Sequence, residues 1–196
     1  MEKIIEKCLE SAMSYLAYKT LVIDLFAEGR STSSNTDEAL LAYSKLNISR
    51  VKRLDKTTKL TNECISVFKE NKRQITWLVL SEGWCGDAAQ NLPIINAVAE
   101  LNTKIDLKIV LRDKHPELMN LFLTNGNESI PKLIQIENNK VVNTWGPRPT
   151  TATKMVIDYK EKHGKLSPEF KTDLQIWYNQ NKGVNLLNDL INLIKQ

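Results

Sequence analysis

The hydrophobic positions in the first third of the chain recur at helical spacing. Residues 2–28 show this spacing throughout and predict one long helix. A polar loop follows, in which Asn35 or Thr36 can cap the next helix. The spacing then predicts a short helix that ends at Leu46 and a longer one over 49–71. This part of the chain is therefore expected to contain helices alone.

The middle of the chain has short apolar runs in place of helical spacing. The run ITWLVLS at 75–81 is rich in β-branched and aromatic residues, which is typical of a strand buried on both faces. Residues 105–112 predict a second strand. Residues 131–145 predict two more, joined by a turn at Asn138 and Asn139, because asparagine tolerates a positive φ.

Helices separate these strands and follow them. They are predicted over 86–102, 116–123, 150–164, 167–183 and 185–196. The order of elements implies parallel strands with crossover helices, followed by an antiparallel hairpin. The fold class is thus α/β, with a mixed sheet of about four strands flanked by helices. We divide the chain into an N-terminal helical extension, a core and a C-terminal helical extension, over 1–71, 72–163 and 164–196.

The last predicted helix carries an apolar stripe made of Leu186, Leu187, Leu190, Ile191 and Ile194. The stripe can be a seam between two copies of the chain or can pack on the body of its own chain. We favour the second interpretation, because the apolar face of a surface helix usually meets its own core. We expect a monomer or a weak homodimer.

Composition is that of an ordinary globular protein. Of 196 residues, 42% are hydrophobic and 26% are charged, and the net charge is +4. The helix over 49–71 has a basic face formed by Arg50, Lys52, Arg53, Lys56 and Lys59. This face can bind nucleic acid or simply face water, and we favour water because no aromatic residues are interleaved for stacking on bases.

No segment of the sequence has the pattern of a membrane span or a secretory signal. Charged residues interrupt the apolar positions at the N-terminus, and no window approaches 18 consecutive apolar residues. We therefore expect a cytoplasmic protein that binds neither membrane nor nucleic acid. In the cytoplasm, thiols stay mostly reduced.

The chain has three cysteines, Cys8, Cys64 and Cys85. Their odd number and wide spacing argue against a disulfide framework, and the lack of a C-x-x-C pair argues against structural zinc. Cys8 and Cys64 lie on apolar helix faces, where we expect core residues. We expect no metal site.

Cys85 has a different setting, because it lies between a predicted strand and the first turn of a helix. Backbone N–H groups and the helix dipole stabilise a thiolate at this position, whereas the nearby charge of Asp87 opposes it. We therefore predict a modestly lowered pKa. A buried, inert thiol is the alternative, but the polar sequences Glu82-Gly83 before Cys85 and Gly86-Asp87 after it favour a solvent-facing, reactive sulfur. Trp84 would shield the sulfur and offer a partner a flat apolar surface.

The segment WCGDAAQNLP resembles the active-site motif of the thioredoxin superfamily, in which W-C-G-P-C opens a long helix. Pro93 lies at the spacing of that helix's kinking proline. The segment SIP at 129–131 resembles the family's cis-proline loop, and WGPRP at 145–149 resembles its glycine loop. The resemblance covers roughly 72–163 and implies a thioredoxin-like fold in which these three loops surround the sulfur.

The departures from the family pattern concern the chemistry. Asp87 stands where the motif has proline, and Ala88 stands where it has the resolving cysteine. Val79 stands where thioredoxins have a buried aspartate. The resemblance therefore implies one-cysteine chemistry, in which an external thiol must resolve any mixed disulfide formed by Cys85.

The resemblance also implies a set of site residues. Cys85 would be the catalytic nucleophile, and the backbone of Ile130 would pair with an extended substrate. Arg148 would stabilise the thiolate or grip a carboxylate, unless it is a solvated loop residue. The residues expected to bind substrate are Trp84, Gly86, Asp87, Ile130, Pro131, Gly146 and Arg148. No cofactor is expected, and glutathione is a candidate co-substrate.

Three functions compete on the sequence alone. The first is a monothiol thiol–disulfide oxidoreductase that acts on protein thiols and disulfides or on glutathione. The second is a redox-inactive thioredoxin-fold module that binds a protein, and the lack of a second cysteine at Ala88 favours it. A one-cysteine peroxidase ranks lowest, because no threonine closely precedes Cys85.

Overall fold

The structure is a computed structural model that describes residues 1–35 and 37–195. The helices are α1 (Glu2–Glu10), α2 (Tyr15–Ala27), α3 (Glu38–Thr57), α4 (Asn62–Glu70), α5 (Gly86–Ala99), the 3-10 turn η1 (Arg112–Lys114), α6 (Pro116–Leu121), α7 (Thr150–His163), α8 (Pro168–Asn181) and α9 (Val184–Lys195). The strands are β1 (Ile75–Ser81), β2 (Ile105–Leu111), β3 (Lys132–Glu137) and β4 (Lys140–Trp145).

The four strands form one mixed sheet in the order β2-β1-β3-β4. Strand β1 runs parallel to β2, with Ile75 opposite Ile105, and β3 is antiparallel to both β1 and β4. Asn138 and Asn139 form the turn of the hairpin with φ values of 51° and 62°. The α/β class, the parallel pair followed by an antiparallel hairpin, and the asparagine turn are confirmed.

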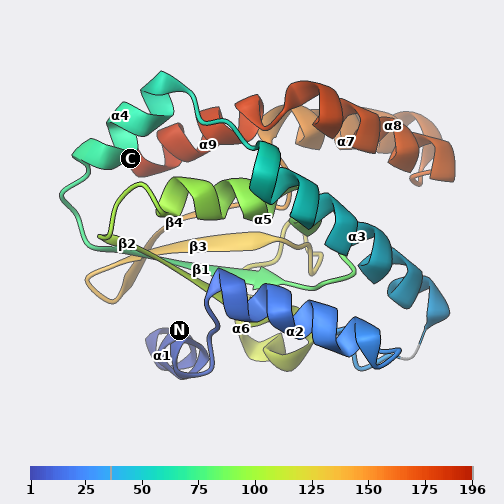
Figure 1. Cartoon of the computed structure of the whole chain (residues 1–196), viewed down its shortest axis with the longest axis horizontal. Coiled ribbons are helices and arrows are strands. Elements are labelled where there is room, and N and C mark those ends of the chain that lie inside the picture. Colours follow the sequence, from blue (N-terminus) through green and yellow to red (C-terminus); the bar gives the residue numbers. More distant parts are fainter. Residues whose placement is uncertain (36, 196) are drawn as a thin grey trace.

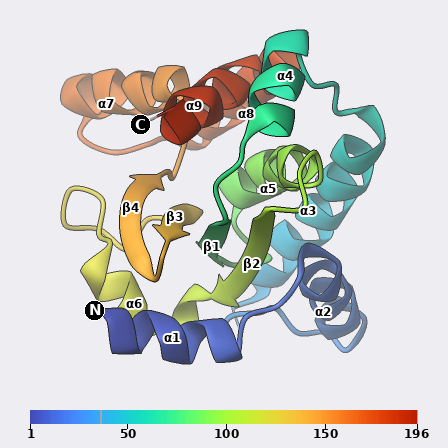
Figure 2. The same ribbon diagram turned by 90° about the vertical axis from the view of Figure 1, so that its left-hand side faces the viewer.

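Helices cover both faces of the sheet (Figures 1 and 2). Helix α5 lies on one face and α6 on the other, while α4 and the C-terminal helices form an outer layer beyond α5. Because β1 lies inside this arrangement, side chains on both of its faces are buried, including Trp77 and Leu78 at 0% exposure. The Trp77 indole N–H donates to the side-chain oxygen of Gln135 at 3.2 Å, which satisfies its polar atom in the core.

The prediction of a single helix over 2–28 is wrong, because the chain forms α1 and α2 with a break between them. At the break, Met13 exchanges two backbone hydrogen bonds with Ile109 of β2, each 2.8 Å long. Ser14 then caps α2 by accepting a hydrogen bond from the Ala17 N–H. Pairing with the open edge of the sheet, a non-local interaction, overrides the local helical spacing.

The predicted break near Leu46 is also wrong, because α3 runs without interruption to Thr57. Asn47 lies inside this helix and is buried, and its side-chain amide donates to the Gly83 carbonyl at 3.0 Å. The cap of α3 is Asp37 in place of Asn35, and Thr36 lies outside the described residues. Helix α4 begins after a separate cap at Thr61.

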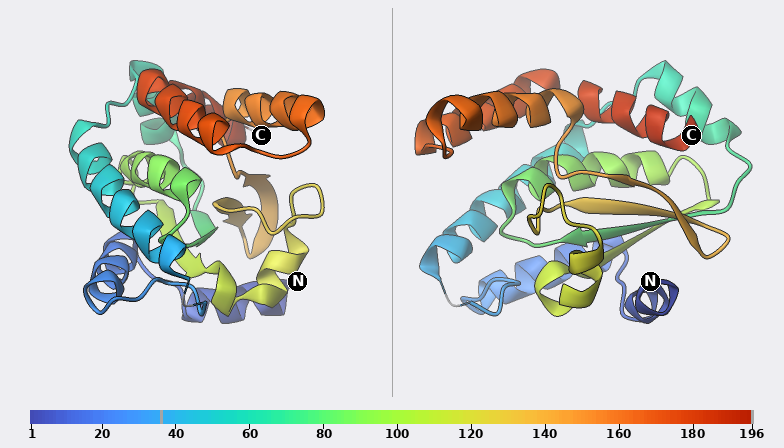
Figure 3. Two further views of the ribbon diagram at one scale, coloured as in Figure 1. Left: turned by 90° about the vertical axis from the view of Figure 1, so that its right-hand side faces the viewer. Right: turned by 180° about the vertical axis from the view of Figure 1, so that it is seen from behind.

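The C-terminal helices pack on the rest of the chain. The apolar stripe of α9 is buried against α4, α5, α7 and β4, which confirms the interpretation as intrachain packing. Helices α7 and α8 share a second small core, in which Val156 meets Phe170 and Leu174. Figure 3 shows these two helices extending as a pair past the end of the sheet toward which β1 points.

The other two cysteines are core residues, as predicted. Cys8 is 4% exposed and Cys64 is fully buried, and burial raises the pKa of both thiols. Among the described helices, none is long and apolar enough to span a membrane.

Candidate functional site at the start of helix α5

Cys85 is the N-cap residue of α5. Its sulfur accepts a hydrogen bond from the Ala88 N–H at 3.4 Å, which is the usual contact of a capping side chain. The thiol donates to the Ile130 carbonyl at 3.3 Å. The sulfur thus lies between the first turn of a helix and the loop that precedes β3.

The loop after β4 closes against the loop before β3. The Ile130–Pro131 and Gly146–Pro147 peptide bonds are both cis. Gly146 has a φ of 114°, and a side chain on it would collide with the Pro131 carbonyl. Glycine is required here both for its backbone conformation and for this close approach.

Asp87 connects three segments of the chain. Its carboxylate forms an ion pair with Arg148 Nη2 at 2.6 Å and accepts a hydrogen bond from the Tyr178 hydroxyl at 2.9 Å. The Asn91 side chain donates to the Asp87 carbonyl at 2.8 Å and to the Tyr178 hydroxyl at 3.3 Å. Beside it, Gln90 donates to Gln175 of α8 at 2.9 Å. Helix α8 therefore lies over the start of α5.

Trp84, on the other side of Cys85, is held by an arginine. The guanidinium of Arg112 lies over the Trp84 ring, 4.9 Å from its centre, a cation–π contact. Arg112 also forms an ion pair with Asp113 at 2.8 Å and donates to the Glu128 carbonyl at 3.3 Å. Arg112 thus has a structural role between the Trp84 ring and Asp113.

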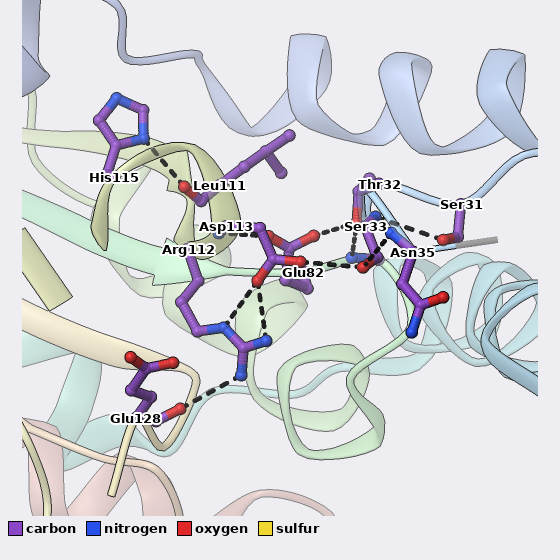
Figure 4. Close-up of polar contacts among 11 residues, drawn as sticks. Ser31, Thr32, Ser33, Asn35, Glu82, Leu111, Arg112, Asp113, His115 and Glu128 are labelled. Atoms are coloured by element: carbon purple, nitrogen blue, oxygen red, sulfur yellow. Dashed lines mark hydrogen bonds and ion pairs between the residues drawn. The ribbon is translucent and has the colours of Figure 1, made fainter. Parts of the chain in front are cut away.

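Glu82, two residues before Trp84, has a buried carboxyl group (Figure 4). Glu82 has no exposed surface and accepts hydrogen bonds from the Thr32 hydroxyl and from the Asp113 N–H. Thr32 also accepts a hydrogen bond from the Gly83 N–H at 3.0 Å, and Ser33 donates to Asp113 at 2.9 Å. The loop between α2 and α3 is thereby tied to the end of β1.

The family follows from a match over this part of the chain. Residues 33–160 match a family model described as thioredoxin, which is more than half of the chain. The chain belongs to the thioredoxin family. No curated protein matches it.

Two solved structures resemble this thioredoxin-family chain. One is a crystal structure of a protein of unknown function from Pseudomonas aeruginosa, with 17% identity and a TM-score of 0.58. The other is an HIV epitope-scaffold, with 18% identity and a TM-score of 0.57. In both cases the likeness covers 93% of this chain and 98% of the other. At these identities the likeness shows the fold alone.

The surroundings of Cys85 differ from the expected solvent-facing turn. Cys85 has only 8% of its surface exposed, so the expectation of a solvent-facing sulfur is wrong. Asp87, Ile130 and Pro131 are buried as well. The expected site residues that keep part of their surface exposed are Trp84, Gly86, Gly146 and Arg148.

The prediction of a lowered thiol pKa in this thioredoxin-family chain is also wrong. Burial, with the nearby charge of Asp87 as a second cause, raises the pKa of Cys85 to about 12. The Ala88 and Asp87 N–H groups and the charge of Arg148 act in the opposite direction but do not offset the burial. Desolvation of a charged sulfur thus outweighs the helix N-terminus.

Arg148 is not a solvated loop residue. It is half-buried and paired with Asp87. Burial raises the pKa of the Asp87 carboxyl, although Arg148 and Tyr178 oppose the rise.

Two buried N–H groups have no hydrogen-bond partner within residues 1–35 and 37–195, namely Trp84 Nε1 and Arg148 Nε. An unpaired buried donor costs about 1–3 kcal/mol, so both groups would gain from an acceptor.

The sequence analysis missed several residues of the site. Tyr178 and Gln175 come from α8, which lies outside the resemblance, and no local pattern marks them as neighbours of Asp87. Glu82 gave a clearer signal, because a carboxyl that directly follows a buried strand is itself a candidate for burial.

Among the described residues, no group of three or more His, Cys, Asp or Glu side chains is placed to hold a metal ion.

The buried Glu82 predicts a specific pH dependence of stability. Burial raises the pKa of Glu82 from 4.5 to about 7, against hydrogen bonds from Asp113 and Thr32 and the charge of Arg112. Between these values the unfolded chain releases the proton and the folded chain keeps it. The free energy of unfolding therefore falls as pH rises from 4.5 to 7, by on the order of 3 kcal/mol, and then levels off.

Urea unfolding of wild type and Glu82→Gln across pH 4–8 measures this contribution. The variant lacks the titrating group, so its stability relative to wild type is expected to rise between pH 4.5 and 7. Glu161→Gln removes the same charge from an exposed position of α7 and is the matched control. Parallel pH profiles for wild type and Glu82→Gln would contradict the prediction.

The Asp87 charge predicts how the thiol responds to substitution. In Asp87→Asn the negative charge beside the sulfur is lost and Arg148 loses its ion-pair partner, so both changes favour the Cys85 thiolate. The pH midpoint of Cys85 alkylation is expected to move down by about one pH unit or more. Asp106→Asn, at an exposed position of β2, is the control. A loosened fold would also lower the midpoint, because it would expose the thiol to water, so urea unfolding of the variant is measured alongside. A lowered midpoint in a variant that stays folded supports the electrostatic account, and an unchanged midpoint would count against it.

Proposed function

We propose that this thioredoxin-family chain is a redox-inactive binding module that recognises an extended protein segment at the surface around Trp84 and Arg148. The observation that carries the proposal is the burial of the Cys85 thiol with a pKa of about 12. The thiolate is the attacking species in disulfide exchange. With this pKa, on the order of one sulfur in 10⁵ is ionised at pH 7.

The surroundings of the sulfur support a role in binding. Ala88 offers no second thiol. The Cys85 thiol donates its hydrogen bond to the Ile130 carbonyl. The half-exposed Trp84 and Arg148 present an aromatic ring and a cation to solvent, and each has one unpaired N–H group. A partner segment would stack an apolar side chain on this ring and place a carboxylate near the guanidinium.

Monothiol exchange is the second candidate, and one observation favours it. The sulfur caps α5 and lies 3.3 Å from the carbonyl beside Pro131, as thiol chemistry on this fold requires. In this reaction the Cys85 thiolate would attack a disulfide, form a mixed disulfide and release the other sulfur as a thiolate. A thiolate of glutathione would then attack the mixed disulfide and return the Cys85 thiolate. The protein would act in the reducing environment of the cytoplasm.

Alkylation kinetics separate the two candidates. Cys85 is to be modified with iodoacetamide from pH 6 to 11, with its peptide followed by mass spectrometry and the urea-unfolded chain as reference. The binding module predicts slow modification with a midpoint well above that of the unfolded chain, which titrates near about 8.5. A midpoint at or below the reference, together with a mixed disulfide formed from oxidised glutathione, would establish monothiol exchange instead.

Peptide selection tests the binding surface directly. Extended peptides selected from a random library on the wild-type protein are expected to bind Cys85→Ser within about twofold, because the sulfur is not part of the contact. Trp84→Ala is expected to weaken binding by tenfold or more, a typical loss for an aromatic anchor. Lys140→Ala, exposed at the hairpin turn, is the control. Peptides that lose affinity equally in all three variants, or that bind only through Cys85, would overturn the assignment.

A further inference from the structure

A cavity of about 480 Å³ lies between α2, α3 and α5, on the side of the α5 start where Gly83 and Ala88 line it. Pockets that hold small molecules have about 300–1,000 Å³ and are lined mainly by apolar side chains with a few polar groups. Most of the residues that line this cavity are apolar or aromatic. The polar ones are the buried Asn47 and Glu82, together with Lys19, Lys52, Asp55 and Lys56. Helix α3 contacts both α5 and α2, and Figure 2 shows the three helices beside one another.

The cavity is a slot, because the lining residues repeat once per helical turn. On α2 they include Tyr15, Tyr18 and Val22, and on α3 they include Ile48 and Val51. On each helix the lining residues span roughly two turns, which corresponds to a length of about 10 Å. The space therefore fits a single extended chain better than a compact ring system.

Small side chains at the inner wall create this space. Ala88 and Ala89 of α5 line the slot together with Gly83. A Cβ on Gly83 would lie 2.9 Å from both methyl groups of Val22, so glycine allows α2 to approach the end of β1. Ala88, the position of the missing second cysteine, thus presents a methyl group to the slot.

The rim of the slot carries an excess of positive charge. Asp55 is neutralised, because it accepts hydrogen bonds from the Tyr15 hydroxyl and from Lys19, each at 2.6 Å. Lys52 and Lys56 line the same rim one turn apart, and neither has a hydrogen-bond or ion-pair partner in the part of the chain that the structure describes. Two ammonium groups at the mouth of an apolar slot match an apolar chain with an anionic head.

We propose that this slot binds a free fatty acid of intermediate chain length, with its chain between α2 and α3 and its carboxylate on Lys52 and Lys56. Burial of the chain supplies the affinity, at roughly 25 cal/mol per Å² of apolar surface. The two lysines select the anionic head and fix the direction of entry. This site goes beyond the proposed binding of a protein segment, because it uses neither Trp84 nor Cys85.

Titration calorimetry with dodecanoate, below its micelle concentration, tests the site on the full chain. One molecule is expected to bind per chain, and dodecanol, which lacks the charge, is expected to bind at least tenfold more weakly. Lys52→Glu combined with Lys56→Glu is expected to weaken dodecanoate binding by tenfold or more. The control is Lys45→Glu combined with Lys59→Glu, which makes the same change of net charge at exposed positions outside the slot, and it is expected to stay within twofold.

A chain-length series tests the slot itself. Val51→Phe shortens the space between α2 and α3, so the length of the best-bound fatty acid is expected to decrease relative to wild type. Equal affinity for dodecanoate and dodecanol, equal losses in the two double variants, or the absence of saturable binding would each overturn the proposal. Binding to anionic phospholipid vesicles without binding of free dodecanoate would also overturn it, in favour of a membrane surface.

Discussion

The ion pair between Asp87 and Arg148 holds the centre of this structure together. It joins the first turn of α5 to the loop after β4, and the Tyr178 hydroxyl joins α8 to the same carboxylate. Both side chains are largely withdrawn from water. Loss of one partner would leave an uncompensated buried charge, which typically costs about 3–5 kcal/mol. The C-terminal helices are therefore part of the architecture around the sulfur.

This closure changes what a thioredoxin fold does with its cysteine. The fold still places Cys85 at a helix start and brings the Ile130 carbonyl to its sulfur. The Cys85 residue is 8% exposed, so its sulfur has little of the water that would stabilise a thiolate, and the proton stays on the thiol. The hydrogen bonds to the sulfur do not lower its pKa below the ordinary value, because burial outweighs them.

The first turn of α5 separates two surfaces with different chemistry. Cys85 and Asp87 face the loops and α8, whereas Ala88 and Ala89 face α2 and α3. Ala88 is a small side chain, which leaves room in the slot on that side. The position at which the family motif has its second cysteine therefore lines the cavity in this chain.

The elements whose structure depends on residues close by in the sequence were predictable from the sequence. The β-branched run of β1, the cap at Cys85 and the asparagines at 138–139 each have a strong local preference, and the family motifs placed them in one fold. Tertiary structure decided the rest. Met13 pairs with Ile109 across the sheet edge, Asn47 stays in a helix because it bonds Gly83, and Tyr178 reaches Asp87 from 91 residues away. The protonation of Cys85 belongs to this second group, because desolvation depends on which distant segments cover an atom and no local pattern records that.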